Sequence, residues 1–133
     1  MITEIMKKIV VLILLALTSC IKDNCVDYLI ENQTEKDLNL VLFEEGTEWR
    51  NTEIKPNASF TELSICDSGG WRISFSGVDS IQIKVNNLVL KTYYPDSPGK
   101  NIYNVDDRDS WLLVVNRKHY QKFVFEITEE DLK

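Results

Sequence analysis

The sequence predicts an all-β domain, an antiparallel β-sandwich of the immunoglobulin-like or a related Greek-key type. Apolar and polar residues alternate in several short runs after residue 25, which is the period of a strand with one buried face. Turn-forming residues separate these runs at spacings of about 8 to 12 residues, as in sandwiches and barrels. No helical period of useful length competes with this pattern. At 133 residues, the chain is long enough for one such domain.

The first element is an apolar segment rather than a strand. Residues 9–17 are uninterrupted apolar residues that follow Lys7 and Lys8. This run has the length of a signal-peptide core, about 7 to 15 residues, and is shorter than the ~20 needed to span a bilayer as a helix. We therefore expect a cleaved signal peptide over residues 1–19. The start of a signal peptide is usually positively charged, and Glu4 is unusual there. Translation that begins at Met6 instead of Met1 would exclude Glu4 from the signal peptide.

The segment ends in Leu17, Thr18, Ser19 and Cys20, which resembles the lipobox of bacterial lipoproteins. The resemblance implies cleavage before Cys20 and acylation of that cysteine, so that the lipid holds the protein at a membrane. Two or more acyl chains give durable attachment where one chain does not. The alternative is an ordinary secretory signal with an incidental cysteine.

The residues after Cys20 predict where the lipoprotein resides. Ile21 is not the aspartate associated with inner-membrane retention, so the resemblance points to the cell outer membrane. Lys22 and Asp23 also resemble the start of the surface-export signal of Bacteroidota lipoproteins, although Asn24 departs from it. We expect residues 20–27 to form a lipidated N-terminus and short tether, followed by a single domain over 28–133.

The charge of the processed chain argues against a nucleic-acid partner. The whole chain has 15 basic and 21 acidic residues; removal of residues 1–19, with Lys7, Lys8 and Glu4, leaves 13 against 20, a net charge of −7. A surface this acidic repels phosphate backbones, and no cluster of basic residues provides a local exception.

Lipidation of Cys20 leaves Cys25 and Cys66, an even number outside the cytoplasm. A disulfide between them would close a loop of about 40 residues and contribute roughly 4 kcal/mol in the chain-entropy model. The alternative is a pair of buried free thiols, which behave as small apolar groups. No further cysteine or histidine lies at ligand spacing, so we expect no metal site and no cofactor.

The alternating runs predict strands near residues 26–30, 38–43, 49–54, 59–65, 71–76, 81–85, 88–93, 111–115 and 123–127. Asn86 and Asn87 tolerate positive φ, so the strands on either side of them should form a tight hairpin. Thr128 can cap a brief terminal helical turn with Asp131 as its capping-box partner.

The segment 80–133 also resembles the C-terminal half of small Bacteroidota lipoproteins that have no assigned activity. The residues that carry this resemblance are Ile81, Ile83, Asn86, Asn87, Tyr93, Tyr94, Pro95, the run 101–104 and the closing run 123–131. They are signatures of a β-domain rather than of catalysis. The resemblance supports the expected location and fold and implies no site.

The loop from Tyr94 to Tyr103 is the candidate binding loop. It contains two prolines and a glycine, and Tyr93, Tyr94 and Tyr103 flank it. Loops held by a rigid scaffold often carry binding residues, and aromatic faces can stack on sugars or on a partner protein. In the alternative interpretation these tyrosines cover one end of the core.

We expect no enzyme activity. His119 is the only histidine, and it lies directly after Arg117 and Lys118. The chain has no nucleophile elbow, zinc motif or phosphate-binding glycine loop. Asn104, Asp106, Asp107 and Asp109 offer oxygen ligands for calcium, but they lack the order of an EF-hand and include Arg108, so a solvated acidic loop is the preferred interpretation.

These observations predict a non-catalytic binding or structural module, anchored by lipid at the outer membrane, with a protein or glycan partner. The alternative is an envelope inhibitor or immunity-type protein that binds a partner enzyme through its acidic surface.

Overall fold

The computed structural model describes residues 2–17 and 23–133. Helix α1 (Ile2–Leu17) corresponds to the expected signal segment. Cys20 and the rest of the lipobox after Leu17 lie outside the described residues. Among the residues described, no helix has both the length and the apolar character needed to cross a bilayer.

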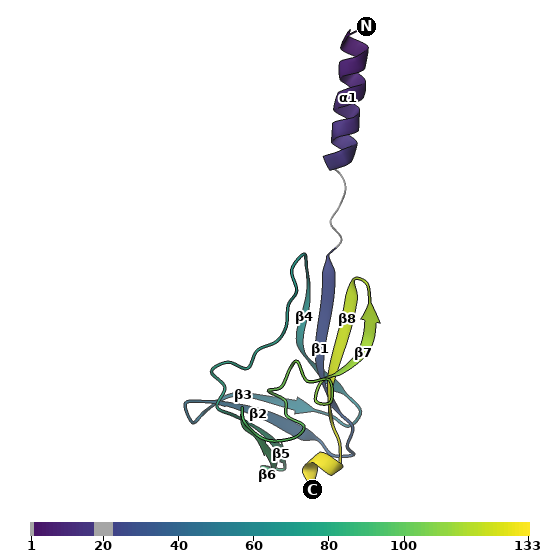
Figure 1. The fold of residues 1–133 in the computed structure, drawn as a ribbon. Helices are drawn as coiled ribbons and strands as arrows, with labels where there is room; N and C mark the ends of the chain where they lie inside the picture. Colours follow the sequence, from purple (N-terminus) through teal and green to yellow (C-terminus); the bar gives the residue numbers. More distant parts are fainter. Residues whose placement is uncertain (1, 18–22) are drawn as a thin grey trace.

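Eight strands form two four-stranded sheets that pack against each other (Figure 1). This architecture confirms the predicted all-β sandwich. The first sheet has the order β4-β1-β8-β7 and consists of β1 (Asn24–Asn32), β4 (Ser59–Asp67), β7 (Leu112–Arg117) and β8 (Tyr120–Ile127). The second has the order β3-β2-β5-β6 and consists of β2 (Leu38–Glu44), β3 (Thr47–Ile54), β5 (Ser80–Val85) and β6 (Leu88–Tyr93).

One strand pair departs from the expected antiparallel arrangement. Strands β1 and β8 run parallel, with Tyr28 opposite Phe123 and Ile30 opposite Phe125, whereas the other pairs are antiparallel. Because β8 follows β7 in a hairpin and lies inside the sheet, its first residues lie beside the start of β1. The first strand and the last strand of the domain are therefore the two inner strands of the first sheet.

The predicted strand over 71–76 is not a strand. Residues 68–79 instead form a connection that leaves β4 in the first sheet and enters β5 in the second. The alternation holds over residues 72–76, where Ile73 and Phe75 are buried and the residues between and beside them are exposed. It does not extend to Trp71, which the pattern places on the buried face but which is exposed. A segment that crosses between sheets can insert alternate side chains into the core without forming a ladder of hydrogen bonds.

The core lies between the sheets and is rich in aromatic rings. Tyr28 stacks on Phe123 with ring centroids 4.8 Å apart, and Trp111 lies 5.5 Å from Phe125. Trp111 precedes β7, is fully buried, and donates its indole N–H to the Ile102 carbonyl oxygen at 2.9 Å. This residue therefore ties the connection before β7 to the core between the sheets.

The local turn chemistry follows the sequence. Asn86 and Asn87 have φ of 50° and 65° and join β5 to β6 as a hairpin. At the C-terminus, a 3-10 helix (Glu130–Leu132) forms the expected turn. The Asp131 carboxylate accepts hydrogen bonds from the Thr128 N–H and hydroxyl, at 2.8 and 2.9 Å. The N-cap is Glu129, however, and no side chain caps the helix, so the predicted cap by Thr128 is wrong.

Cys25 on β1 and Cys66 on β4 are register partners and are joined by a disulfide. The bridge fixes the edge strand β4 to the central strand β1 at the end of the domain where β1 begins. Because β1 already starts at Asn24, residues 24–27 belong to the strand and not to the expected tether.

Candidate binding site

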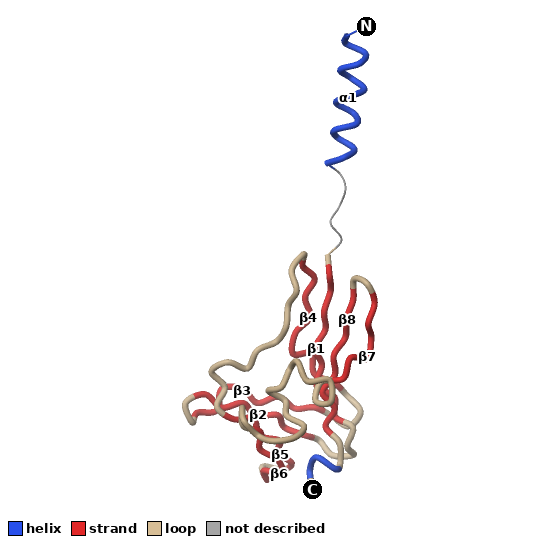
Figure 2. The backbone as a smooth tube through the Cα atoms, in the orientation of Figure 1, coloured by secondary structure: helices blue, strands red, loops and turns tan. Residues whose placement is uncertain are grey.

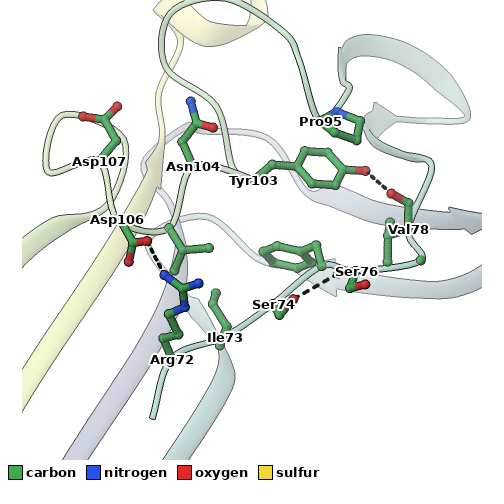
Figure 3. Close-up of a pocket in the computed structure, with 13 residues that line it drawn as sticks. Arg72, Ile73, Ser74, Ser76, Val78, Pro95, Tyr103, Asn104, Asp106 and Asp107 are labelled. Carbon is green, nitrogen blue, oxygen red and sulfur yellow. Dashed lines mark hydrogen bonds and ion pairs between the residues drawn. The ribbon is translucent and has the colours of Figure 1, made fainter. Parts of the chain in front are cut away.

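Two long connections face each other across a groove of about 610 Å³. The first is the 68–79 connection, and the second links β6 to β7 over residues 94–111. Both are drawn in tan in Figure 2, beside the red strands that they join. Residues 72–78 line one wall of the groove, residues 103–107 line the other, and Pro95 lies at its margin (Figure 3).

The first wall is positioned by its buried side chains. Ile73, Phe75 and Val78 are each less than a tenth exposed and pack into the core. Arg72 and Ser74 lie between or beside them in the chain and are exposed. The same alternation that resembles a strand therefore fixes the backbone and presents a row of polar side chains to the groove.

The second wall is organised by a buried amide. Asn101 is fully buried, and its side-chain N–H₂ group donates to the carbonyl oxygens of Tyr94 and Ser97 at 2.8 and 3.1 Å. Its Oδ1 accepts the Tyr103 N–H at 3.1 Å, and its own N–H donates to Ser110 Oγ at 3.0 Å. These bonds hold the 94–111 connection in one conformation before any ligand arrives.

Three side-chain contacts join the walls. The Tyr103 hydroxyl donates to the Val78 carbonyl oxygen at 2.9 Å, and its ring meets the Phe75 ring edge-on at 5.8 Å. Burial, with a smaller contribution from Asp79, raises the pKa of Tyr103 to about 12, so this hydroxyl remains a donor at neutral pH. Arg72 also forms an exposed ion pair with Asp106 across the groove (Figure 3).

The acidic residues at the groove do not converge on one point. Asp106 pairs with Arg72, while Asp107 accepts hydrogen bonds from the Ser110 hydroxyl at 2.7 Å and the Asp109 N–H at 3.1 Å. The hydrogen bond from Ser110 makes the larger contribution and that from Asp109 a smaller one, and together they lower the pKa of Asp107 and keep it ionised. Over residues 2–17 and 23–133, no three acidic, histidine or cysteine side chains form a group able to hold a metal ion.

The three tyrosines predicted to form a binding loop have different environments. Tyr93 packs in the core, edge-on to Phe125 at 5.7 Å, and is 1 % exposed, so its assignment to a ligand-contacting surface is wrong. It lies opposite Ile81 on the inward face of the β5–β6 hairpin, and burial raises its pKa. Tyr103 is half-buried and lines the groove, and Tyr94 is exposed.

Sequence reasoning missed the first wall of the groove. The alternation over residues 71–76 predicts a strand. The outer side chains of a strand would lie on a sheet face, so the pattern gives no indication of a groove. His119, the remaining candidate, lies in the β7–β8 turn with Nδ1 3.0 Å from Asn24 Oδ1. Its hydrogen-bond partner is thus an amide rather than a carboxylate or a nucleophilic hydroxyl.

The groove offers a guanidinium, carboxylates, hydroxyls and an amide beside apolar side chains. This set can donate and accept hydrogen bonds along an extended polar ligand. Comparisons with protein-family models, with curated proteins and with solved structures find no match for the chain. Its function therefore has to be inferred from its own residues.

Proposed function

We propose that this chain is a lipid-anchored protein of the cell outer membrane whose β-sandwich is a non-catalytic binding module. The observation that carries the binding role is the groove between residues 72–78 and 103–107, whose walls are joined by the Tyr103 hydroxyl. A site that is already ordered loses less conformational entropy when it binds, which favours affinity.

The chemistry of the groove favours an oligosaccharide as the ligand. Sugars present alternating hydroxyl donors and acceptors, and Arg72, Ser74, Asn104 and Asp106 supply complementary groups along the two walls. Sugars also have apolar C–H faces, which can pack on the Tyr103 ring or on the Val105 side chain. Apolar side chains with a few placed polar groups are typical of small-molecule binding sites, where the polar groups fix the orientation of the ligand.

The anchor is supported by sequence and by the position of the first strand. The lipobox ends at Cys20, and β1 begins at Asn24, so only three residues separate the lipidated cysteine from the domain. The disulfide between Cys25 and Cys66 suits a compartment outside the cytoplasm.

The binding role is tested by titrating the purified protein with oligosaccharides from a glycan array and measuring affinity by calorimetry. Arg72→Gln and Asp106→Asn each remove a charged hydrogen-bonding group, and we expect each to weaken binding at least tenfold, about 1.4 kcal/mol. The matched control is Asp37→Asn, which breaks the exposed Asp37–Lys55 ion pair outside the groove. Equal losses in the control, or no glycan bound by the natural chain, would contradict the role.

The anchor is tested separately by Cys20→Ser in the bacterial host. We expect the natural chain to fractionate with membranes and to incorporate labelled fatty acid, and the variant to do neither. A variant that still fractionates with outer membranes would overturn the lipid anchor.

The second candidate is an envelope inhibitor or immunity-type protein, favoured by the net charge of −7 after processing. Such a protein would co-purify with a basic enzyme and release it as salt rises, because surface charges are screened over about 8 to 10 Å. A salt-sensitive basic partner together with no glycan binding would select this candidate.

A further inference from the structure

The end of the domain where β1 begins carries a second hollow, of about 470 Å³. It is lined by the β7–β8 turn, by the first residues of β1, and by Trp71 in the connection that follows β4. The strand registers bring these segments together, because Cys25 lies opposite Cys66 on one side and Tyr120 on the other. In Figure 1 this is the upper end of the domain, where the chain enters β1.

This end is mechanically fixed to the start of β1. The Cys25 N–H donates to the His119 carbonyl oxygen at 2.9 Å, and the His119 ring contacts the Asn24 side chain. The disulfide at Cys25 joins β4 on the opposite side. An attachment that positions residue 24 therefore also positions the β7–β8 turn and the end of β4.

The two ends of the domain differ in how their charged side chains are paired. Arg117 and Lys118 are exposed at the β7–β8 turn, and neither forms an ion pair with a residue that the structure describes. The acidic groups near this end are Asp23, Asp27 and Asp67. Asp27 accepts the Tyr120 hydroxyl at 2.7 Å, and Asp67 accepts the Ser68 N–H at 2.6 Å. The C-terminal run lies at the opposite end (Figure 1), and its carboxylates are all paired: Glu129 with Lys36, Glu130 with Lys133 and Asp131 with Lys100.

Trp71 adds an apolar contact beside the two cations. Its side chain is 51 % exposed, and its indole nitrogen lies near Gly69 and hydrogen-bonds to the Asp67 carboxylate, so that the ring lies over the loop that follows β4. Exposed indoles favour the boundary between water and lipid, where the ring contacts acyl chains and the N–H stays among polar headgroups.

We propose that this end of the domain, formed by Trp71, Arg117 and Lys118, docks on an anionic phospholipid surface and sets the orientation of the domain. The inference rests on the proposed anchor at Cys20. Asn24 is four positions after Cys20, a distance of at most about 14 Å along the chain, so the lipid holds this end against the headgroups. The two cations attract anionic headgroups, while the acidic remainder of the domain is repelled and points away.

The test uses the full lipidated chain with Trp49→Phe, reconstituted in vesicles of phosphatidylcholine and phosphatidylglycerol with brominated acyl chains. Trp111 is fully buried and Trp71 is exposed, so bromine that quenches fluorescence reports on Trp71. We expect quenching in these vesicles, its loss in a Trp71→Phe variant, and weaker quenching in vesicles of phosphatidylcholine alone.

The charge contribution is tested with a matched pair of double variants. Arg117→Gln with Lys118→Gln should lower the ratio of docked to free domain about tenfold, since each cation near an anionic surface contributes measurably to attraction. Lys36→Gln with Lys133→Gln makes the same change in net charge through exposed residues near the C-terminal end, and should leave quenching unchanged.

The possible outcomes separate docking from anchoring. Vesicles that carry the protein through a flotation gradient while Trp71 remains unquenched would overturn docking and leave the anchor intact. A chain that fails to float would overturn the anchor and docking with it. Equal quenching in both lipid mixtures, or equal effects of the two double variants, would overturn the role of the anionic headgroups.

Discussion

At the residue scale, the domain depends on a small number of buried polar groups. Asn32 at the end of β1 is fully buried, and its side-chain N–H₂ group donates to the carbonyl oxygens of Lys36 and Ile54 at 2.7 and 2.8 Å. Its Oδ1 accepts hydrogen bonds from the Thr34 N–H and hydroxyl. One amide thus satisfies the backbone where the chain passes from the first sheet to the second.

Asn32→Ala should therefore destabilise the domain by about 2 to 4 kcal/mol, because several buried donors and acceptors lose their partners together. The measurement is urea unfolding followed by circular dichroism. Asn39→Ala provides the control, since the Asn39 side chain makes an exposed bond to Asn51 and should cost less than about 0.5 kcal/mol. Similar unfolding midpoints for the two variants would show that the Asn32 network contributes little.

Asp27 provides a pH-dependent contribution at the same scale. The Ser64 hydroxyl, at 2.6 Å, and the Tyr120 hydroxyl, at 2.7 Å, donate to its carboxylate and lower its pKa below the usual aspartate value. Its folded pKa lies below its unfolded pKa, so it stabilises the fold above about pH 4 and loses that effect as pH falls through the folded value. Asp27→Asn should be less stable than the natural chain at pH 7, and the difference should vanish near pH 2. A difference that stays constant across this range in urea titrations would refute the assignment.

At the scale of elements, the alternating pattern predicted most strands, but the only strand pairing that the sequence predicted is the hairpin of β5 and β6. Leu40 and Leu42 fall on one face of β2 as the period of two requires, and the Asn86–Asn87 turn identified its hairpin. The run 71–76 shows the limit of this reasoning. Alternation reports that one side of an extended segment is buried, whereas a strand also needs a neighbouring edge, which depends on residues distant in sequence.

The disulfide is the second feature at this scale, because it fixes the exposed start of a central strand. Cys25→Ser with Cys66→Ser should lower the free energy of unfolding by about 2 to 4 kcal/mol, since the unfolded chain regains the freedom of a long loop. In this variant, hydrogen exchange should show lost protection first at the backbone N–H of residue 25, which in the natural chain donates to the His119 carbonyl oxygen in the β7–β8 turn. Unchanged protection there would mean that strand pairing alone holds this end.

At the scale of the whole molecule, the sandwich and the groove share the same two connections. Residues 68–79 and 94–111 carry the chain between sheets, contribute core side chains such as Phe75 and Trp111, and line the groove with their outer residues. Neither the parallel pairing of β1 with β8 nor the contact between Tyr103 and Val78 has a local signal in the sequence. Both depend on how the two sheets pack, so the groove could not be predicted, although Tyr103, Asn104, Asp106 and Asp107 of its second wall were candidates from the sequence.

Trp111 is the residue through which core stability and groove geometry are coupled. It contacts Tyr28 and Phe125 within the sandwich, and its indole N–H holds the Ile102 carbonyl just before the second wall of the groove. Trp111→Phe keeps an aromatic ring but leaves a small cavity and an unpaired carbonyl. We expect a loss of about 2 to 3 kcal/mol and faster hydrogen exchange over residues 101–107.

The matched substitution is Trp49→Phe, which makes the same chemical change at a side chain that is 55 % exposed on β3. It should shift the urea midpoint little and leave exchange in the groove unchanged. If the Trp111 variant loses stability but residues 101–107 exchange as slowly as before, then Asn101 alone organises the second wall. If both variants unfold at the same urea concentration, the core does not depend on the Trp111 indole, and the proposed coupling between packing and groove is wrong.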